Sequence, residues 1–296
     1  MSITLEAPAK INLSLDITGV RPNGYHEVRM VMQTITLFDT LTMSASDDIS
    51  LDIEGSELKA DDDNLCIRAA KLYVAETASD NEIRGLSMRL KKRIPMGAGL
   101  GGGSADAAAV LRGANVLSER SGAHPLSEDK LMELAFKLGA DVPYCLAGGT
   151  KLAEGLGEIL TALPDLADCH ILLGKPVESA STGEIYTAYD AAKDILHPDV
   201  DAQIRAICQN DIHKVARHCG NVLTDVTIGS VPAISRIKKI MAAQGALCSE
   251  MSGSGSAVFG IFNDERDAGA AKRKLLDQMP DLFTAIVRPC AGAAWE

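Results

Sequence analysis

Apolar and polar residues alternate near the start of the chain, in the pattern of a half-buried β-strand. Each apolar residue over 11–18 is followed by a polar one, and the apolar positions are Ile11, Leu13, Leu15 and Ile17. Because side chains two residues apart share one face of a strand, the pattern predicts a strand here. The turn sequence Arg-Pro-Asn-Gly at 21–24 and the β-branched stretch 28–38 then predict a second strand.

Helical spacing replaces this alternation further along the first half. Asn64 is suited to cap a helix that begins at Leu65, and Ser127 is suited to cap one that ends at Gly139. The alanine-rich stretch 105–117 has the composition of a buried helix. A further strand is predicted at 49–53, and 86–95 alternates before it ends in a basic cluster.

The pattern changes near 162–165, and the second half again mixes strands and helices. Ser181 and Glu184 have the spacing of a capping box that opens a short helix. Further helices are predicted at 200–208, 212–218, 231–244 and 264–277, and strands at 170–173, 247–251, 257–262 and 284–287. We therefore predict an α+β protein with two lobes, residues 1–162 and residues 163–296.

Charge and cysteine content restrict the class of protein. The 296 residues include 40 acids and 29 bases, for a net charge of -11, which disfavours nucleic acid or an anionic membrane as partner. Seven dispersed cysteines without a C-x-x-C pair are typical of a reducing compartment. The first residues lack the features of an export signal, and no apolar run reaches membrane-spanning length, so we expect a cytoplasmic protein.

Five glycines between Gly97 and Gly103 precede the predicted helix 105–117. Glycine lets the backbone approach a ligand closely, and the N-terminus of a helix favours an anion. The segment therefore predicts a phosphate-binding loop, although a flexible linker is the alternative. Lys91, Lys92 and Arg93 beside it could form a basic patch for an anionic substrate or could be solvated surface.

Two better-known phosphate loops fit this segment less well. A P-loop requires Gly-Lys-[Ser/Thr], and Gly103 is followed directly by Ser104. Residues 97–102 match G-x-G-x-x-G, but the stretch before them alternates instead of being wholly apolar. A dinucleotide-dependent oxidoreductase therefore stays the alternative from another reaction class.

Three segments in order resemble the GHMP kinases, a family of ATP-dependent small-molecule kinases. They are the stretch 7–13 (Ala-Pro-Ala-Lys-Ile-Asn-Leu), the glycine loop 95–108, and the stretch 251–259 (Met-Ser-Gly-Ser-Gly-Ser-Ala-Val-Phe). The resemblance implies an N-terminal lobe like ribosomal protein S5 domain 2 and a ferredoxin-like C-terminal lobe. It also implies ATP and Mg²⁺ as cofactors, and a monomer or weak homodimer.

Further motifs at 21–26 and 139–143 resemble one branch of that family, whose members phosphorylate a cytidine-diphosphate-bearing substrate in isoprenoid synthesis. The resemblance implies that the glycine loop binds the phosphates of ATP and that the hydroxyl of Ser104 helps to hold Mg²⁺. Asp106 is more simply interpreted as a first-turn acid favoured by the helix dipole. The loop residues implied are Pro95, Met96, Gly97, Ala98, Gly99, Leu100, Gly101, Gly102, Gly103, Ser104 and Ala105.

The same resemblance implies the groups that act on the acceptor hydroxyl. Asp141 would accept the proton of that hydroxyl, and Lys10 would pair with Asp141. From residue statistics alone, Asp141 would be a turn residue before Pro143, and Lys10 an edge or surface residue of a strand. The residues implied for the acceptor substrate are Asn12, Tyr25, His26, Thr182 and Tyr186, with ordinary packing as the alternative for the two tyrosines.

Three functions remain open at this point. One is the kinase of a cytidyl substrate, and the second is another GHMP kinase activity. The third is a nucleotide-binding regulator that has the fold without catalysis; the presence of both Lys10 and Asp141 argues against it.

Overall fold

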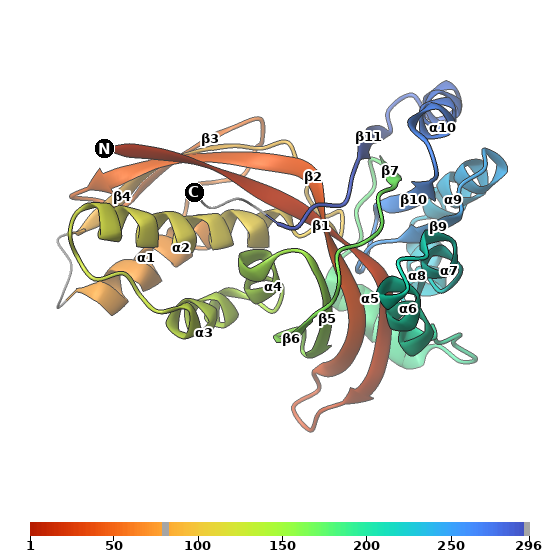
Figure 1. The fold of residues 1–296 in the computed structure, drawn as a ribbon, viewed down its shortest axis with the longest axis horizontal. Helices are drawn as coiled ribbons and strands as arrows, with labels where there is room; N and C mark the ends of the chain where they lie inside the picture. Colours follow the sequence, from red (N-terminus) through yellow and green to blue (C-terminus); the bar gives the residue numbers. More distant parts are fainter. Residues whose placement is uncertain (79–82, 293–296) are drawn as a thin grey trace.

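A seven-stranded sheet takes six of its strands from the first half of the chain and β8 from the second half in the computed structural model, which describes residues 1–78 and 83–292. Its strand order is β3-β4-β2-β1-β8, and β5 pairs with both β2 and β6. Helices α1, α2 and α3 lie on one side of this sheet (Figure 1). The strands are β1 (Ser2–Val20), β2 (His26–Ser46), β3 (Ser50–Glu54), β4 (Gly85–Lys91), β5 (Thr150–Gly155), β6 (Ile159–Ala162) and β8 (Gly220–Asn221).

A smaller, antiparallel sheet forms much of the second half, in the order β11-β7-β10-β9. Helices α9 and α10 pack on it, and the chain returns to contact β2 through Pro289 and Ile35. The strands are β7 (His170–Lys175), β9 (Cys248–Met251), β10 (Val258–Phe262) and β11 (Phe283–Val287).

The described part of the chain contains ten helices. Those of the first half are α1 (Leu65–Thr77), α2 (Gly102–Arg120), α3 (Glu128–Leu138) and α4 (Val142–Ala147). Those of the second half are α5 (Thr182–Ala191), α6 (Val200–Cys208), α7 (Ile212–Arg217), α8 (Thr224–Ser230), α9 (Ala233–Ala243) and α10 (Glu265–Gln278). No helix in the described ranges is both long enough and apolar enough to span a bilayer.

The first strand is longer and more deeply buried than its alternation predicted. Residues 7–15 are all buried, because β1 passes between the two apolar cores of the molecule. Ile11 and Leu13 belong to one core, whereas Leu15 and Ile17 belong to the other. A shift in the pairing register between Asn12 and Ser14 accompanies this change of side.

The predicted helix caps agree with the structure where a side chain faces a free N–H group. Asn64 accepts a hydrogen bond from the N–H of Cys66 at 2.9 Å, and Ser127 accepts one from Lys130 at 3.3 Å. The predicted helix after Ser181 is present as α5, but the predicted capping box is wrong, because the Ser181 side chain makes no cap hydrogen bond. The predicted helix 231–244 is preceded by a separate short helix, α8.

Candidate active site

The glycine loop connects β4 to α2, and its backbone adopts a conformation suited to glycine. Gly97, Gly99 and Gly101 have φ angles of 58°, 73° and 70°, in the left-handed region that other residues avoid. Gly101 is the N-cap of α2. The free N–H groups at the start of this nineteen-residue helix are therefore available next to the loop.

The third sequence motif packs directly on this loop. Ser252 donates a hydrogen bond from Oγ to the carbonyl of Gly99 at 2.9 Å, and the N–H of Ala257 donates to the carbonyl of Ala98 at 3.0 Å. A side chain on Gly99 would place its Cβ 2.0 Å from the carbonyl oxygen of Ser252. The second half of the chain therefore reaches the glycine loop by a close backbone contact that requires glycine.

A cleft of about 380 Å³ opens between these segments. It brings together residues from β1, the glycine loop, α4, α5 and the 252–256 loop. The predicted site residues that line it are Lys10, Asn12, Gly97, Gly99, Gly101, Ser104, Asp141, Thr182 and Tyr186.

Lys10 and Asp141 form an ion pair in this cleft, as the resemblance implied. The Nζ atom of Lys10 lies 3.3 Å from Oδ2 of Asp141 and donates a hydrogen bond to Oδ1 of Asn12 at 2.8 Å. The Lys10 side chain is only 4% exposed, whereas that of Asp141 is 33% exposed. A buried ammonium thus holds a carboxylate that a substrate can still reach, which is the geometry of a positioned general base.

Short α4 determines where this carboxylate points. Gly139 ends α3, and Asp141 follows as the N-cap of α4, whose N-terminus contains Pro143. The Asp141 side chain makes no cap hydrogen bond in the described part of the chain. It is therefore directed to Lys10 instead of to its own helix.

The predicted substrate residues divide into two groups. Thr182 and Tyr186 line the cleft, where Thr182 Oγ1 lies 2.9 Å from Oγ of Ser254. His26 lies behind Tyr186, with ring centroids 4.8 Å apart, and its Nε2 atom is 2.7 Å from Oδ1 of Asp190. Burial raises the pKa of Tyr186 to about 12. Tyr25 is 61% exposed on the β1–β2 hairpin and is not among the residues that line the cleft.

The prediction of a basic patch beside the loop is wrong at Lys92. Its Nζ atom is buried and forms ion pairs with Asp39 and, at 2.6 Å, with Oδ2 of Asp106. Burial alone would lower the pKa of Lys92, but the attraction of Asp106 and Asp39 outweighs it and holds that pKa above its ordinary value. Lys92 is therefore committed to two protein carboxylates.

The interpretation of Asp106 as a first-turn acid is also wrong. α2 begins at Gly102, its first turn holds no acidic residue, and Asp106 is buried against Lys92. Burial raises the pKa of Asp106 to about 7. Asp39 completes the cluster by accepting hydrogen bonds from the N–H groups of Arg93 and Ile94, the latter at 2.8 Å. The sequence contained no local signal for Asp39, because Asp39 lies in β2, more than fifty residues before the segment that it contacts.

Two other observations bear on the alternatives. Buried and exposed residues alternate along β4, so the wholly buried strand of a dinucleotide fingerprint is lacking before this loop.

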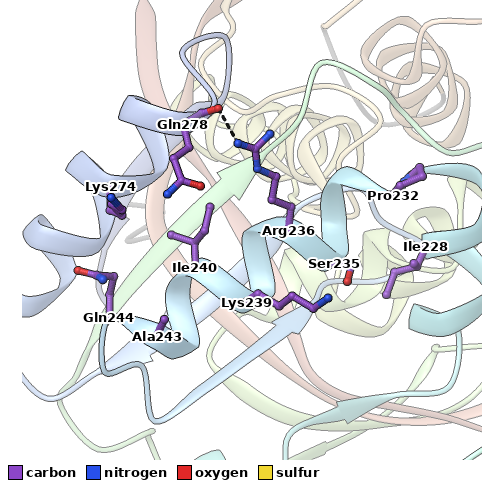
Figure 2. Close-up of a pocket in the computed structure, with 10 residues that line it drawn as sticks. All are labelled: Ile228, Pro232, Ser235, Arg236, Lys239, Ile240, Ala243, Gln244, Lys274 and Gln278. Carbon is purple, nitrogen blue, oxygen red and sulfur yellow. Dashed lines mark hydrogen bonds between the residues drawn. The ribbon is translucent and has the colours of Figure 1, made fainter.

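A further cavity, between α9 and α10, is lined by three cationic side chains and, in the described ranges, by no carboxylate (Figure 2). Only the glycine cleft of these two combines a phosphate loop with a candidate base.

Comparison with known proteins identifies relatives over nearly the whole chain. Residues 64–149 match the model of the GHMP kinases N terminal domain, and residues 203–281 match that of the GHMP kinases C terminal domain. A 4-diphosphocytidyl-2-C-methyl-D-erythritol kinase of Lachnospira eligens is 46% identical over 276 residues, 93% of each chain. The corresponding kinase of Geobacillus kaustophilus is 43% identical over 268 residues, 90% of each chain.

Solved structures give the same result. A crystal structure of 4-(cytidine 5'-diphospho)-2C-methyl-D-erythritol kinase superposes with a TM-score of 0.77 at 30% identity, covering 97% of this chain and 99% of that one. Homoserine kinase from Cytophaga hutchinsonii superposes with a TM-score of 0.76 at 19% identity, over 98% and 95% of the two chains. The second likeness shows the shared two-lobed α+β fold.

Proposed function

This chain belongs to the GHMP kinase family, and from that premise we propose that it transfers the γ-phosphoryl group of ATP to the 2-hydroxyl of 4-diphosphocytidyl-2-C-methyl-D-erythritol. This reaction belongs to the non-mevalonate route to isoprenoid precursors. The family is ATP-dependent, and the acceptor is taken from the activity of relatives that are 40–46% identical over most of the chain. The observation that carries the proposal is the Lys10–Asp141 pair, which faces the same cleft as the glycine loop.

The glycine loop is proposed to hold the phosphates of ATP. Positive φ angles at three glycines bring main-chain N–H groups to the surface of the loop, and the start of α2 adds further donors. The residues proposed for this role are those from Pro95 to Ala105. These contacts come from the backbone and therefore do not depend on the side chains of the loop.

A second pocket, of about 350 Å³, has space for the adenosine of ATP. It borders the start of the loop, where Pro95 and Met96 line it together with residues 55–57 after β3, and Met96 is 48% exposed. Asp141 and Tyr186 line the first cleft and not this pocket. We therefore assign the acceptor to the first cleft and the adenosine to the second pocket, with the phosphates between them.

Asp141 is proposed as the general base and Lys10 as its partner. Asp141 accepts the proton of the acceptor hydroxyl, whose oxygen forms a bond to the γ-phosphorus while the bond to the β–γ bridging oxygen breaks. The products are ADP, the phosphorylated acceptor and a proton on the carboxyl group. Lys10 keeps the carboxylate in position, and Asn12 keeps Lys10 in position.

Mg²⁺ is the further cofactor that we propose, and bound Mg²⁺ would neutralise charge on the phosphates. The described residues hold no cluster of three or more His, Cys, Asp or Glu that could bind a metal ion. Such a cluster is unnecessary, because Mg²⁺ commonly takes one or two protein oxygens and completes its shell with phosphates and water. Ser104, whose hydroxyl lies in α2 beside the cleft, fits this requirement.

The aromatic residues at the end of the cleft are proposed to bind the cytosine of the acceptor. Tyr186 offers a ring in the cleft, His26 supports that ring from behind, and the exposed ring of Tyr25 is free to stack. Thr182 would bind the substrate through its hydroxyl. The roles of Thr182, Tyr186 and His26 rest on the resemblance and on position, since the first two line the cleft and His26 contacts Tyr186, whereas the role of Tyr25 rests on the resemblance alone.

Three broader expectations remain proposals. We place the lobe boundary at 162/163, where β6 ends at Ala162 and β7 begins at His170. We expect a cytoplasmic protein that acts as a monomer or weak homodimer. We expect a small-molecule acceptor and no nucleic-acid partner, in line with the net charge of -11.

A panel of acceptors tests the proposed activity. ADP release is measured with the purified chain, ATP and Mg²⁺, using the cytidyl substrate, its uridyl analogue, mevalonate and homoserine as acceptors. We expect turnover with the cytidyl substrate at a kcat/KM far above the other three. Preference for mevalonate or homoserine would instead indicate another GHMP activity, and nucleotide binding without turnover would indicate a catalytically silent regulator.

A further inference from the structure

A second cavity lies apart from the glycine cleft, on the helical surface of the second half of the chain. It has a volume of about 630 Å³ and is bordered by α8, α9 and α10 (Figure 2). Its apolar part is formed by Ile228, Pro232, Ile240 and Ala243. A cavity of this size with an apolar floor is in the range of small-molecule sites.

Three cationic side chains line the cavity at separate places along α9 and α10 (Figure 2). They are Arg236 and Lys239 on α9 and Lys274 on α10, and all three are exposed. Neither lysine forms an ion pair with a described residue, whereas the adjacent Lys238 pairs with Glu250 at 2.7 Å. In a chain whose net charge is -11, a cavity with three cations and no acidic residue among its described lining is a local anion-attracting site.

Arg236 is already fixed at the edge of the cavity. Its Nη2 atom donates a hydrogen bond to the main-chain carbonyl of Gln278 at 3.1 Å, across the gap between α9 and α10 (Figure 2). The bond restrains the guanidinium and leaves other N–H groups for a ligand. A restrained guanidinium is well suited to a phosphate group, because its N–H donors match the spacing of the phosphate oxygens.

We propose that this cavity binds a small amphipathic phosphate, with the phosphate group at the guanidinium of Arg236, positive charge from Lys239 and Lys274 elsewhere on the lining, and a short apolar chain on the floor. Three cations favour a dianionic phosphate over a carboxylate, which carries a single charge. The apolar floor favours an alkyl chain over inorganic phosphate. The proposal goes beyond the kinase reaction and does not depend on which acceptor the glycine cleft uses.

Helix α8 connects this cavity to the glycine cleft. Ile228 lines the cavity, and the preceding residue, Thr227, places Oγ1 3.4 Å from the carbonyl oxygen of Ser254. Ser254 in turn lines the glycine cleft and contacts Thr182. A ligand that moves α8 would therefore displace the 252–256 loop, so we expect occupancy of the cavity to change the KM of the kinase.

Isothermal titration calorimetry with four probes tests the binding step. The probes are hexyl phosphate, inorganic phosphate, hexanoate and 1-hexanol, each titrated into the full chain. We expect hexyl phosphate to bind at least about tenfold more tightly than the other three probes. We also expect its affinity to fall as salt is added. Equal affinity for inorganic phosphate would overturn the apolar part of the proposal, and equal affinity for hexanol would overturn the anionic part.

Two pairs of variants locate the probe. Ala243→Glu places a carboxylate in the cavity, whereas Ala242→Glu adds the same charge at an exposed position of α9 outside it. The double variant Lys239→Gln/Lys274→Gln is matched by Lys272→Gln/Arg273→Gln on α10, which removes the same charge at two residues that do not line the cavity. We expect hexyl phosphate to bind roughly tenfold more weakly to the first member of each pair and unchanged to the second. Unchanged binding to Ala243→Glu would overturn the site.

The kinase assay separates this cavity from the active site. We expect saturating hexyl phosphate to change the KM for ATP or acceptor in the wild type and in Ala242→Glu, but not in Ala243→Glu. An effect that persists in Ala243→Glu would place the probe in the glycine cleft and overturn the proposal. Unchanged kinetics in the wild type at full occupancy would overturn the link through α8.

Discussion

The ammonium group of Lys10, in the middle of β1, lies 3.3 Å from the carboxylate of Asp141 at the N-terminus of α4. The main-chain N–H of Lys10 also donates a hydrogen bond to the carbonyl of Leu100 in the glycine loop, at 2.9 Å. Lys10 therefore contacts both the proposed base and the proposed phosphate loop. Any movement of β1 at this position would change both.

The first prediction concerns this pair. Asp141→Asn should lower kcat by about 10²–10⁴ while ATP still binds, because the amide cannot accept the proton of the hydroxyl. Lys10→Ala should also lower kcat, and the double variant should lose less than the product of the two effects, since the residues act as a unit. Steady-state kinetics and calorimetric titration of ATP measure both quantities, with exposed Asp129→Asn as control. Near-normal turnover by Asp141→Asn would assign the base elsewhere.

The second prediction concerns Gly101, whose φ of 70° and position beside Lys10 both disfavour a side chain. A Cβ there would lie 2.9 Å from Cγ of Lys10, so Gly101→Val should weaken ATP binding and also lower kcat by moving the Lys10 ammonium. Gly269→Val on α10 is the matched control, because it lies outside the loop and its Cβ would meet only Nη1 of Arg273 at 3.7 Å, an ordinary contact. Wild-type ATP affinity in folded Gly101→Val would contradict the proposed role of the loop.

Several features of this site were predictable because they depend on local sequence. The glycine loop is recognisable from composition, and the caps at Asn64 and Ser127 depend on residues two or three positions away. Short elements were missed, including β5, β6, α4 and α8. Their four to seven residues give too few repeats of either period to stand out.

The buried cluster of Asp39, Lys92 and Asp106 could not be predicted in this way. Its members come from β2, from the segment after β4 and from α2, and each has a simpler local interpretation. A lysine within a basic run is usually solvated, and an acid near a helix start usually serves the dipole. Only the folded chain brings the three side chains together in the buried interior, where charged groups must pair with each other.

The third prediction concerns the stability that this cluster contributes. Lys92→Met would leave Asp39 buried without its ammonium partner, so we expect a loss of about 3–5 kcal/mol in the free energy of unfolding. Lys91→Met, at the exposed neighbouring position, should change it by no more than about 0.5 kcal/mol. Urea titration followed by circular dichroism measures both variants. Equal stability of the two would mean that Lys92 is not the required partner of Asp39.

The last prediction concerns base recognition at the end of the cleft. His26 packs on Tyr186 with ring centroids 4.8 Å apart and lies 2.7 Å from Asp190, so its removal would free the Tyr186 ring. Stacking of an aromatic ring on a base contributes ~1–3 kcal/mol in nucleic-acid complexes. His26→Ala should therefore raise the KM for the cytidyl substrate roughly tenfold, leave ATP affinity unchanged and reduce the preference for cytidyl over uridyl analogues.

Tyr25→Ala tests the exposed ring on the same hairpin, and Val20→Ala, also exposed there, serves as the matched control. If Tyr25 stacks on the base, its variant should resemble His26→Ala in KM and in base preference, because both would weaken the stacking of aromatic rings on the cytosine. If only His26→Ala changes these quantities, recognition depends on Tyr186 and on its contact with His26, and Tyr25 stays a surface residue. Unchanged KM and base preference in both variants would assign cytosine recognition to Tyr186 alone, since of these three residues only Tyr186 lines the cleft.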